Sequence, residues 1–131
     1  MKKITTFLAA LAFASFAAAV TAGEFPDISY QELKTAIDAG KVTVLDANGS
    51  ESFGKSHIPT AIDFKANKDK LADLLPKDKK ALVVAYCANP KCSAYQSAAK
   101  AAQGLGYKNV KHFSAGIQGW DKASGKGEKV E

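Results

Sequence analysis

The sequence of 131 residues contains no arginine, so all 18 of its basic residues are lysines. Guanidinium groups suit phosphates and other oxyanions because they donate two hydrogen bonds in a fixed fork. The lysines also form no basic stripe interleaved with aromatic residues, although the formal net charge is +5. We therefore predict no nucleic-acid partner and interpret the lysines as a solvated surface.

Cysteine is almost as scarce, because the chain has only Cys87 and Cys92. Their Cys-x4-Cys spacing differs from the Cys-x-x-Cys of thioredoxin-like redox motifs. A zinc site would need two further ligands from His57, His112 or carboxylates, and no metal-ligand spacing connects these residues. We predict no metal and no cofactor.

The composition itself is that of an ordinary globular protein, with 47% hydrophobic and 24% charged residues. This is enough apolar material for a hydrophobic core and too little charge for a disordered chain. No internal repeat is visible. A chain of this length is expected to form one domain.

The first residues have the pattern of a targeting segment. Lys2 and Lys3 precede an apolar or small stretch at 4–20, and Ala22 closes a small-residue cleavage site. An uncleaved membrane anchor is the alternative, but the apolar run is short and ends in the small residues that signal peptidase prefers at its cleavage site. We predict a cleaved signal peptide at 1–22 of bacterial type, export to the oxidising periplasm, and no membrane attachment after cleavage.

The remaining residues, 23–131, alternate between helix and strand patterns. Ser29 and Glu32 form a capping box at the start of a helix that ends near Gly40. Strands are predicted at Val42–Asp46, Ala61–Phe64, Ala81–Tyr86 and Asn109–Phe113, and helices at Lys70–Leu75, Ser93–Leu105 and, as a turn or short helix, from Gly116. The stretch 47–60 is predicted to be polar turns, and the tail from about residue 123 to be frayed.

This alternation predicts an α/β domain with a parallel sheet and helices on both faces. Residues 81–86 are apolar on both faces, as expected of a central parallel strand. Ligands of such sheets bind beyond the carboxyl ends of the strands. The loops after Leu45 and Tyr86 are therefore the candidate site.

Cys87 stands at the start of the second of these loops. Backbone amides of a curled loop and of the following helix would stabilise an anion there. Such surroundings lower the pKa of a thiol and raise its thiolate fraction. A thiolate held by amides can attack a sulfane sulfur and keep the product as a persulfide anion.

The mature chain resembles the single-domain rhodanese family over nearly its whole length. The resemblance rests on Ile28-Ser29 with Glu32-Leu33, Val44-Leu45-Asp46, His57-Ile58-Pro59-x-Ala61-Ile62, Val83-Val84-x-Tyr86-Cys87, Ser93-Ala94, Leu105-Gly106-Tyr107-x-Asn109-Val110 and Ala115-Gly116-Ile117-x-x-Trp120. Each piece is weak alone, and their order and spacing make the match specific.

The resemblance implies a parallel sheet of about five strands and a sulfurtransferase that carries a persulfide on Cys87. It implies a small sulfane-sulfur donor such as thiosulfate or polysulfide, and a thiol or cyanide as the acceptor. The six-residue active loop begins at Cys87, and the loop and substrate-binding positions are Ala88, Asn89, Pro90, Lys91 and Ser93. Lys91 is the only charged side chain in the loop, so we expect it to contact substrate.

Three positions depart from the family pattern. Cys92 replaces the usual loop arginine, Pro90 replaces a glycine, and Asn48 replaces an arginine after the first strand. The forked guanidinium that suits thiosulfate is thus missing, which predicts poor thiosulfate:cyanide transfer. A phosphatase or arsenate reductase of the same fold would need a longer loop that ends in arginine, where this chain has Ser93.

Cys92 has three interpretations. It packs as a small apolar residue, it forms a disulfide with Cys87, or it resolves the Cys87 persulfide by attacking it. If the disulfide is permanent, the chain is instead a non-catalytic rhodanese-like module with a redox-active cysteine pair.

Asp46 and His57 are predicted to support the site. Asp46 orients the loop or accepts backbone amides in a turn, and His57 fixes a turn by bonding the backbone. We place His112 on a solvated face or at a strand end, and Trp120 in the core.

Overall fold

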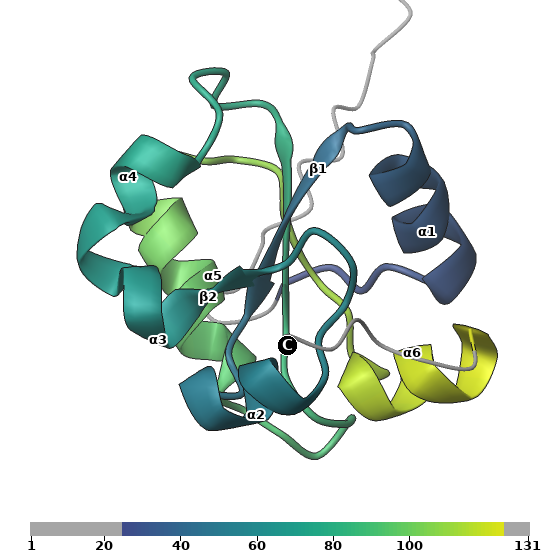
Figure 1. Cartoon of the computed structure of the whole chain (residues 1–131). Coiled ribbons are helices and arrows are strands. Elements are labelled where there is room, and N and C mark those ends of the chain that lie inside the picture. Colours follow the sequence, from purple (N-terminus) through teal and green to yellow (C-terminus); the bar gives the residue numbers. More distant parts are fainter. Residues whose placement is uncertain (1–24, 125–131) are drawn as a thin grey trace, which may run out of the picture.

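A four-stranded parallel sheet lies at the centre of the computed structural model, which describes residues 25–124 (Figure 1). The strands are β1 (Val42–Asp46), β2 (Ile62–Asp63), β3 (Leu82–Tyr86) and β4 (Val110–His112), in the order β2-β1-β3-β4. Asp46 pairs with Tyr86, so the carboxyl ends of β1 and β3 lie side by side. The predicted α/β class with a parallel sheet is confirmed.

The sheet has four strands instead of the expected five. At the position beyond β4, a single bridge joins Asp27 to His112. Ile28 donates to the His112 carbonyl and the His112 amide donates to Pro26, at 2.9 and 2.8 Å. The pairing stops there because Pro26 has no amide hydrogen and Ser29 already caps a helix.

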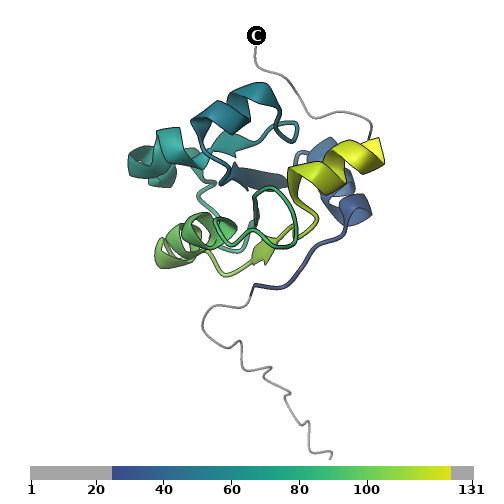
Figure 2. The same cartoon turned by 90° about the horizontal axis from the view of Figure 1, so that it is seen from below.

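Helices cover both faces of the sheet, as Figures 1 and 2 show. They are α1 (Tyr30–Asp38), α2 (Ser50–Lys55), α3 (Phe64–Asn67), a 3-10 turn η1 (Lys68–Lys70), α4 (Leu71–Leu74), α5 (Tyr95–Gly104) and α6 (Gly116–Ser124). One core layer joins α3, α4 and α5 to Leu45, Val83 and Ala85. The other joins α1 and α6 to Val44, Val84 and Tyr86.

Short-range patterns explain several of these elements. The capping box is confirmed, since Ser29 accepts from the Glu32 amide and Glu32 accepts from the Ser29 amide. Ala98, Ala99 and Ala102 turn a fully buried face of α5 to the sheet. Their small side chains let this helix approach β3 and β4 closely, which holds the loop between Tyr86 and α5 short and tight.

Two local predictions were wrong. The stretch 47–60 contains helix α2, which buries none of its side chains and so carries no apolar periodicity. The strand expected at 61–64 is only two residues long, because Asp63 caps α3 by accepting from the Ala66 amide at 3.2 Å. The helix expected at 70–75 is the end of a run formed by α3, η1 and α4.

The predicted signal peptide at 1–22 lies outside the described residues, as does the tail after Ser124. Helix α6 continues through Ser124, slightly past the expected start of that tail. None of the helices within residues 25–124 is both long and apolar enough to cross a membrane.

Candidate functional site

Cys87 follows the last residue of β3 at the carboxyl edge of the sheet. Its side chain is 1% exposed. The Ala47 amide donates to the Tyr86 carbonyl at 2.9 Å, which ties the loop after β1 to the residue before Cys87. Cys87 therefore occupies the crevice position that α/β sheets use for ligands.

Cys87 and Cys92 are joined by a disulfide, with their Cα atoms 6.2 Å apart. The turn between them is organised by Asn89. Its carbonyl accepts from the Cys92 amide at 3.1 Å, and its side-chain Oδ1 accepts from the Lys91 amide at 3.0 Å. Of the three interpretations of Cys92, the structure therefore contains the disulfide, and the Asn-Pro turn brings the two sulfurs together.

The first turn of α6 holds the other side of this loop. The Ile117 amide donates to the Cys87 carbonyl at 2.9 Å, and the Gln118 amide donates to the Ala88 carbonyl at 3.0 Å. Gly116 makes this approach possible: it has φ +64°, and a Cβ there would lie 2.5 Å from the Ala88 carbonyl carbon. Sequence reasoning missed this role, and the only sign of it was the Ala115-Gly116-Ile117 motif.

Several amides of the loop are left available. Within residues 25–124, no hydrogen bond uses the backbone amides of Ala88, Asn89 or Ser93. Helix α5 begins just after them, and its N-cap, Ala94, supplies no side-chain acceptor. These unpaired amides and the positive end of the helix can stabilise an anion formed at Cys87 once the disulfide is reduced.

Asp46 and Tyr86 form a buried pair at the carboxyl ends of β1 and β3, next to the two loops. The Tyr86 hydroxyl donates to Asp46 Oδ2 at 2.5 Å and accepts from the Ile58 amide at 3.0 Å, while the Asn48 amide donates to Asp46 Oδ1 at 2.7 Å. Burial raises the pKa of the Asp46 carboxyl, against the effect of these hydrogen bonds. Burial and the Asp46 charge raise the pKa of Tyr86, so its hydroxyl stays protonated.

His57 lies in the turn before β2, with 6% of its surface exposed. Its Nδ1 lies 2.9 Å from the Phe53 carbonyl oxygen, which accepts the hydrogen bond, and its ring stacks on Phe53 with centroids 3.8 Å apart. These contacts join α2 to the turn. His57 also lies close enough to Asp46 to favour the ionised form of that carboxyl.

Of the two expectations for His112, the strand end is confirmed and the solvated face is wrong. His112 ends β4 and is 8% exposed, because Tyr95 from the start of α5 stacks on its ring with centroids 3.3 Å apart. Its Nε2 is buried without a hydrogen-bond partner among residues 25–124. Burial lowers the pKa of His112, and the Asp27 carboxylate opposes this shift. The spacing of Val110 and His112 places both on the buried face of β4, but the stacked Tyr95 could not be read from this short strand.

The remaining predicted site residues line the outside of the loop. Pro90, Lys91 and Ser93 are exposed, and Ala88 and Asn89 are partly buried. No ion pair involves Lys91 in the described part of the chain. The structure thus brings Cys87 and Cys92 together, places Asp46 at the neighbouring strand end, where it bonds Tyr86, and leaves Lys91 at the surface.

A hollow of about 350 Å³ opens between the loop after β1 and the helices α3 and α5. We call it the basic groove, and its lining includes Asn48, Gly49, Lys65, Lys68, Ala94 and Ser97. Sequence reasoning missed Lys65 and Lys68, because lysines on short helices resemble any other surface lysine.

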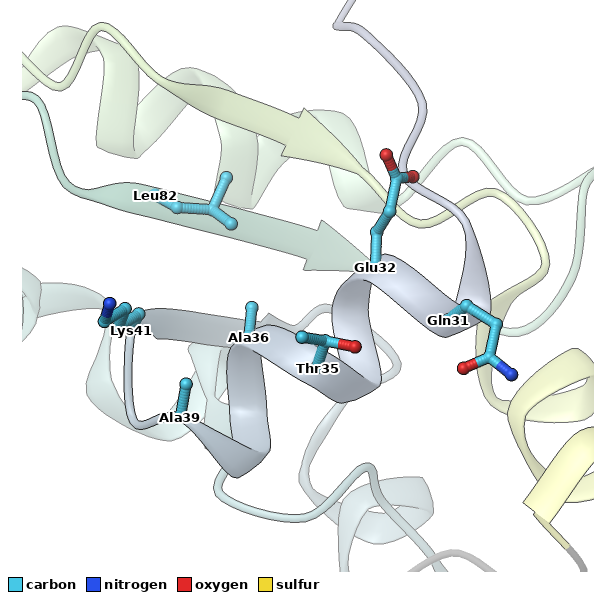
Figure 3. Close-up of a pocket in the computed structure, with 7 residues that line it drawn as sticks. All are labelled: Gln31, Glu32, Thr35, Ala36, Ala39, Lys41 and Leu82. Carbon is cyan, nitrogen blue, oxygen red and sulfur yellow. The ribbon is translucent and has the colours of Figure 1, made fainter.

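A larger hollow of about 520 Å³ runs along α1 (Figure 3). It is lined by Thr35 and Ala36 of this helix, by Ala39 just after it and by Leu82 at the start of β3. It contains no cysteine or histidine and reaches the amino end of β3, whereas Cys87 follows the carboxyl end. We therefore do not assign the reactive site to this hollow, although it is larger than the basic groove. Among residues 25–124, no group of three or more His, Cys, Asp or Glu side chains could hold a metal ion.

Known proteins resemble this arrangement. A family model described as a Rhodanese-like domain matches residues 29–123. An HTH-type transcriptional regulator of Mycobacterium tuberculosis is 34% identical over 113 residues, which cover 84% of this chain and 48% of that protein. The chain thus spans about half the length of this curated relative.

Solved structures resemble the fold as well. A Bacillus halodurans protein has a TM-score of 0.61 and 26% identity, covering 79% of this chain and 77% of its own. A human single-domain sulfurtransferase has a TM-score of 0.57 and 18% identity, covering 74% of this chain and 96% of its own. At this identity, the human protein supports the fold alone.

Proposed function

The chain belongs to the rhodanese-like family, and from this premise we propose that it is a sulfurtransferase that carries a sulfane sulfur as a persulfide on Cys87. The observation that carries the proposal is the position of Cys87. It is a buried cysteine at the carboxyl end of a central parallel strand, next to loop amides without acceptors in the described chain. A persulfide anion needs such donors.

The proposed reaction begins with reduction of the Cys87–Cys92 disulfide by a thiol. The Cys87 thiolate then attacks the sulfane sulfur of polysulfide or thiosulfate. A new sulfur–sulfur bond forms, the donor's sulfur–sulfur bond breaks, and its electron pair leaves with the shorter polysulfide or with sulfite. A thiolate or cyanide acceptor takes the outer sulfur in the second step and restores the Cys87 thiolate.

Cys92 offers a second exit for the sulfur. Its thiolate attacks the Cys87 sulfur of the protonated persulfide, forms the disulfide, and releases hydrosulfide. The sulfane sulfur is reduced to sulfide and the two cysteines are oxidised, so a thiol must reopen the disulfide before the next cycle. The proposal requires that the two sulfurs can come into contact. The disulfide between them in the structure supports it.

Thiosulfate is proposed as a poor donor. The chain has no arginine, and within the active loop the only cation is the exposed Lys91. Lysine is a point charge and cannot bind a dianion in a bidentate way.

Intact-protein mass spectrometry tests the proposal. The reduced protein is mixed with polysulfide, and we expect Cys87 to gain the mass of one sulfur atom. Cys87→Ser should abolish this gain, whereas Cys92→Ser should increase the persulfide that accumulates because the resolving thiol is gone. A folded, reduced protein that takes up no sulfur from any sulfane donor would refute sulfur transfer.

A second candidate function is a non-catalytic rhodanese-like module with a redox disulfide. The Cys87–Cys92 bond favours it, because a bonded Cys87 cannot act as a nucleophile. Thiol titration of the native protein separates the two functions. If a mild thiol reductant frees both cysteines and Cys87 then accepts sulfur, the sulfurtransferase is supported. If the disulfide resists thiol reductants, the non-catalytic module is supported.

We also propose that the protein acts in the periplasm after removal of residues 1–22. The pattern of Lys2, Lys3 and the apolar stretch that follows supports this location. The N-terminal sequence of the protein released by osmotic shock tests it. A mature start at Gly23 is expected, and an intact N-terminus retained in the cytoplasmic fraction would contradict the proposal.

A further inference from the structure

The basic groove contains two lysines that form no ion pair with an acidic group of the described chain. Lys65 on α3 and Lys68 on η1 are both exposed, and neither makes an ion pair within residues 25–124. None of the residues that line the groove is acidic. The adjacent Asp63 is buried and already accepts a hydrogen bond from the Ala66 amide. The groove therefore favours an anion.

The other lining groups suit an organic molecule. Phe64 supplies an apolar wall, and it is itself 7% exposed. The Ser97 side chain is exposed on the first turns of α5 and is available to polar groups of a ligand, whereas the Asn48 side chain already bonds the Asp46 carboxyl. A volume of about 350 Å³ lies in the range of small-molecule sites. Two cations, polar groups and an apolar wall together match a molecule that is larger than a simple oxyanion.

The groove adjoins the active loop at two points. Ala47, which lines it, donates its amide to Tyr86, the residue before Cys87. Ala94, which also lines it, comes two residues after Cys92. Side chains of a strand alternate between the two faces of the sheet. Val83 and Ala85 face the core layer of α3, α4 and α5, and Cys87, two residues further on, is therefore turned to the same face. The groove therefore borders the loop that carries Cys87, on the face of the sheet toward which Cys87 is turned.

We infer that the basic groove binds the thiol part of the sulfur donor, and that this donor is a small organic persulfide that carries carboxylates. The inference rests on the proposed sulfur transfer at Cys87. Lys65 and Lys68 hold the carboxylates, Ser97 bonds the polar backbone of the donor, and its outer sulfur lies toward Cys87.

The step balances without a further reactant. The Cys87 thiolate attacks the outer sulfur of the persulfide RS–SH, where R is the carboxylate-bearing part. The bond between the two donor sulfurs breaks, and its electron pair leaves as the thiolate RS⁻. Cys87 becomes Cys87–S–SH, and the only prior requirement is the reduced cysteine pair.

Steady-state kinetics with two donors test this inference. Glutathione persulfide carries two carboxylates, whereas the persulfide of 2-mercaptoethanol carries none. In Lys65→Ala/Lys68→Ala we expect KM for glutathione persulfide to rise about fivefold to tenfold, the effect of losing two exposed ion pairs. KM for the donor without carboxylates should remain the same, and the difference between donors should shrink at high salt.

A matched control removes the same charge elsewhere. Lys77 and Lys108 are exposed and precede β3 and β4, at the opposite edge of the sheet. Lys77→Ala/Lys108→Ala should leave both KM values unchanged. If the control raises KM as much as the groove variant does, the effect is one of net charge and the inference fails.

Binding of S-methylglutathione, which cannot transfer sulfur, provides a readout that does not depend on activity. The amide resonances of Gly49, Ala94 and Ser97 should shift on titration, and the Lys65/Lys68 variant should lose the shifts. If polysulfide loads Cys87 but neither kinetics nor shifts involve the lysines, the groove inference fails and sulfur transfer stands. If no donor loads Cys87, both fail.

Discussion

The loops that follow β1 and β3 lie side by side at the same edge of the sheet, but they are held in different ways. The loop after β1 depends on side chains, because the buried Asp46 carboxyl accepts from Tyr86 and from the Asn48 amide. The loop after β3 depends on its backbone, because α6 amides bond the Cys87 and Ala88 carbonyls. The anchor of the β3 loop therefore makes no use of the two cysteine side chains, which bond each other, whereas the anchor of the β1 loop occupies the Asp46 carboxyl.

Gly116→Ala should have the largest effect, because it breaks the backbone anchor. The new Cβ would lie 2.5 Å from the Ala88 carbonyl carbon and would require a left-handed φ of +64°. We expect a loss of about 1–2 kcal/mol from the backbone conformation and about 1–3 kcal/mol from overpacking. Urea denaturation measures the free energy of unfolding.

Gly40→Ala is the matched control for this variant. Gly40 has φ +66°, but a Cβ there would meet no atom within 4 Å. It should lose only the conformational part, about 1–2 kcal/mol. Equal losses in the two variants would show that the approach of α6 to the active loop is not tight.

Tyr86→Phe breaks the side-chain anchor. Removal of the hydroxyl leaves the buried Asp46 Oδ2 and Ile58 amide without this partner, and we expect a loss of about 1–3 kcal/mol. Tyr107→Phe is the control, since its hydroxyl donates to the Pro76 carbonyl at a partly buried site. It should lose about 1 kcal/mol. The comparison would be wrong if the Tyr107 variant were the less stable of the two.

His112 extends the comparison to the third strand end at this edge. Burial lowers its pKa in the folded state, so the unfolded chain binds the proton first as pH falls. Its contribution to stability is therefore complete above the ordinary value of 6.5 and is lost progressively below it. His112→Phe keeps a ring against Tyr95 and should weaken the dependence of the unfolding free energy on pH below 6.5. An unchanged slope would mean that His112 is not held neutral.

Reduction of the disulfide should have the smallest effect on the loop anchor. The acceptors of the Ile117 and Gln118 amides are backbone carbonyls, which reduction does not remove. Hydrogen exchange should therefore leave these two amides protected after reduction, while the Cys92 amide, bonded to the Asn89 carbonyl, exchanges faster. Rapid exchange at Ile117 would show that the disulfide, and not α6, holds the loop.

Much of the fold could be predicted because its patterns are local. The capping box of Ser29 and Glu32 and the buried strand ending at Tyr86 each involve residues close in the chain. The same holds for the position of Cys87 at the end of that strand. Helix α2 was missed because it buries no side chain. The predicted number of strands was one too high, because a single bridge at Asp27 stands where a fifth strand was expected.

The sequence by itself therefore determined the α/β alternation, the family resemblance and the position of Cys87 directly after a central strand. The tertiary structure decided which distant residues meet there. Gly116 lies against Ala88, Tyr95 covers His112, and Lys65 and Lys68 share a groove with Asn48. These contacts join segments that are distant in the chain, so no periodicity or local motif records them. They arise from the close packing of α3, α5 and α6 on one sheet, which is a property of the whole domain.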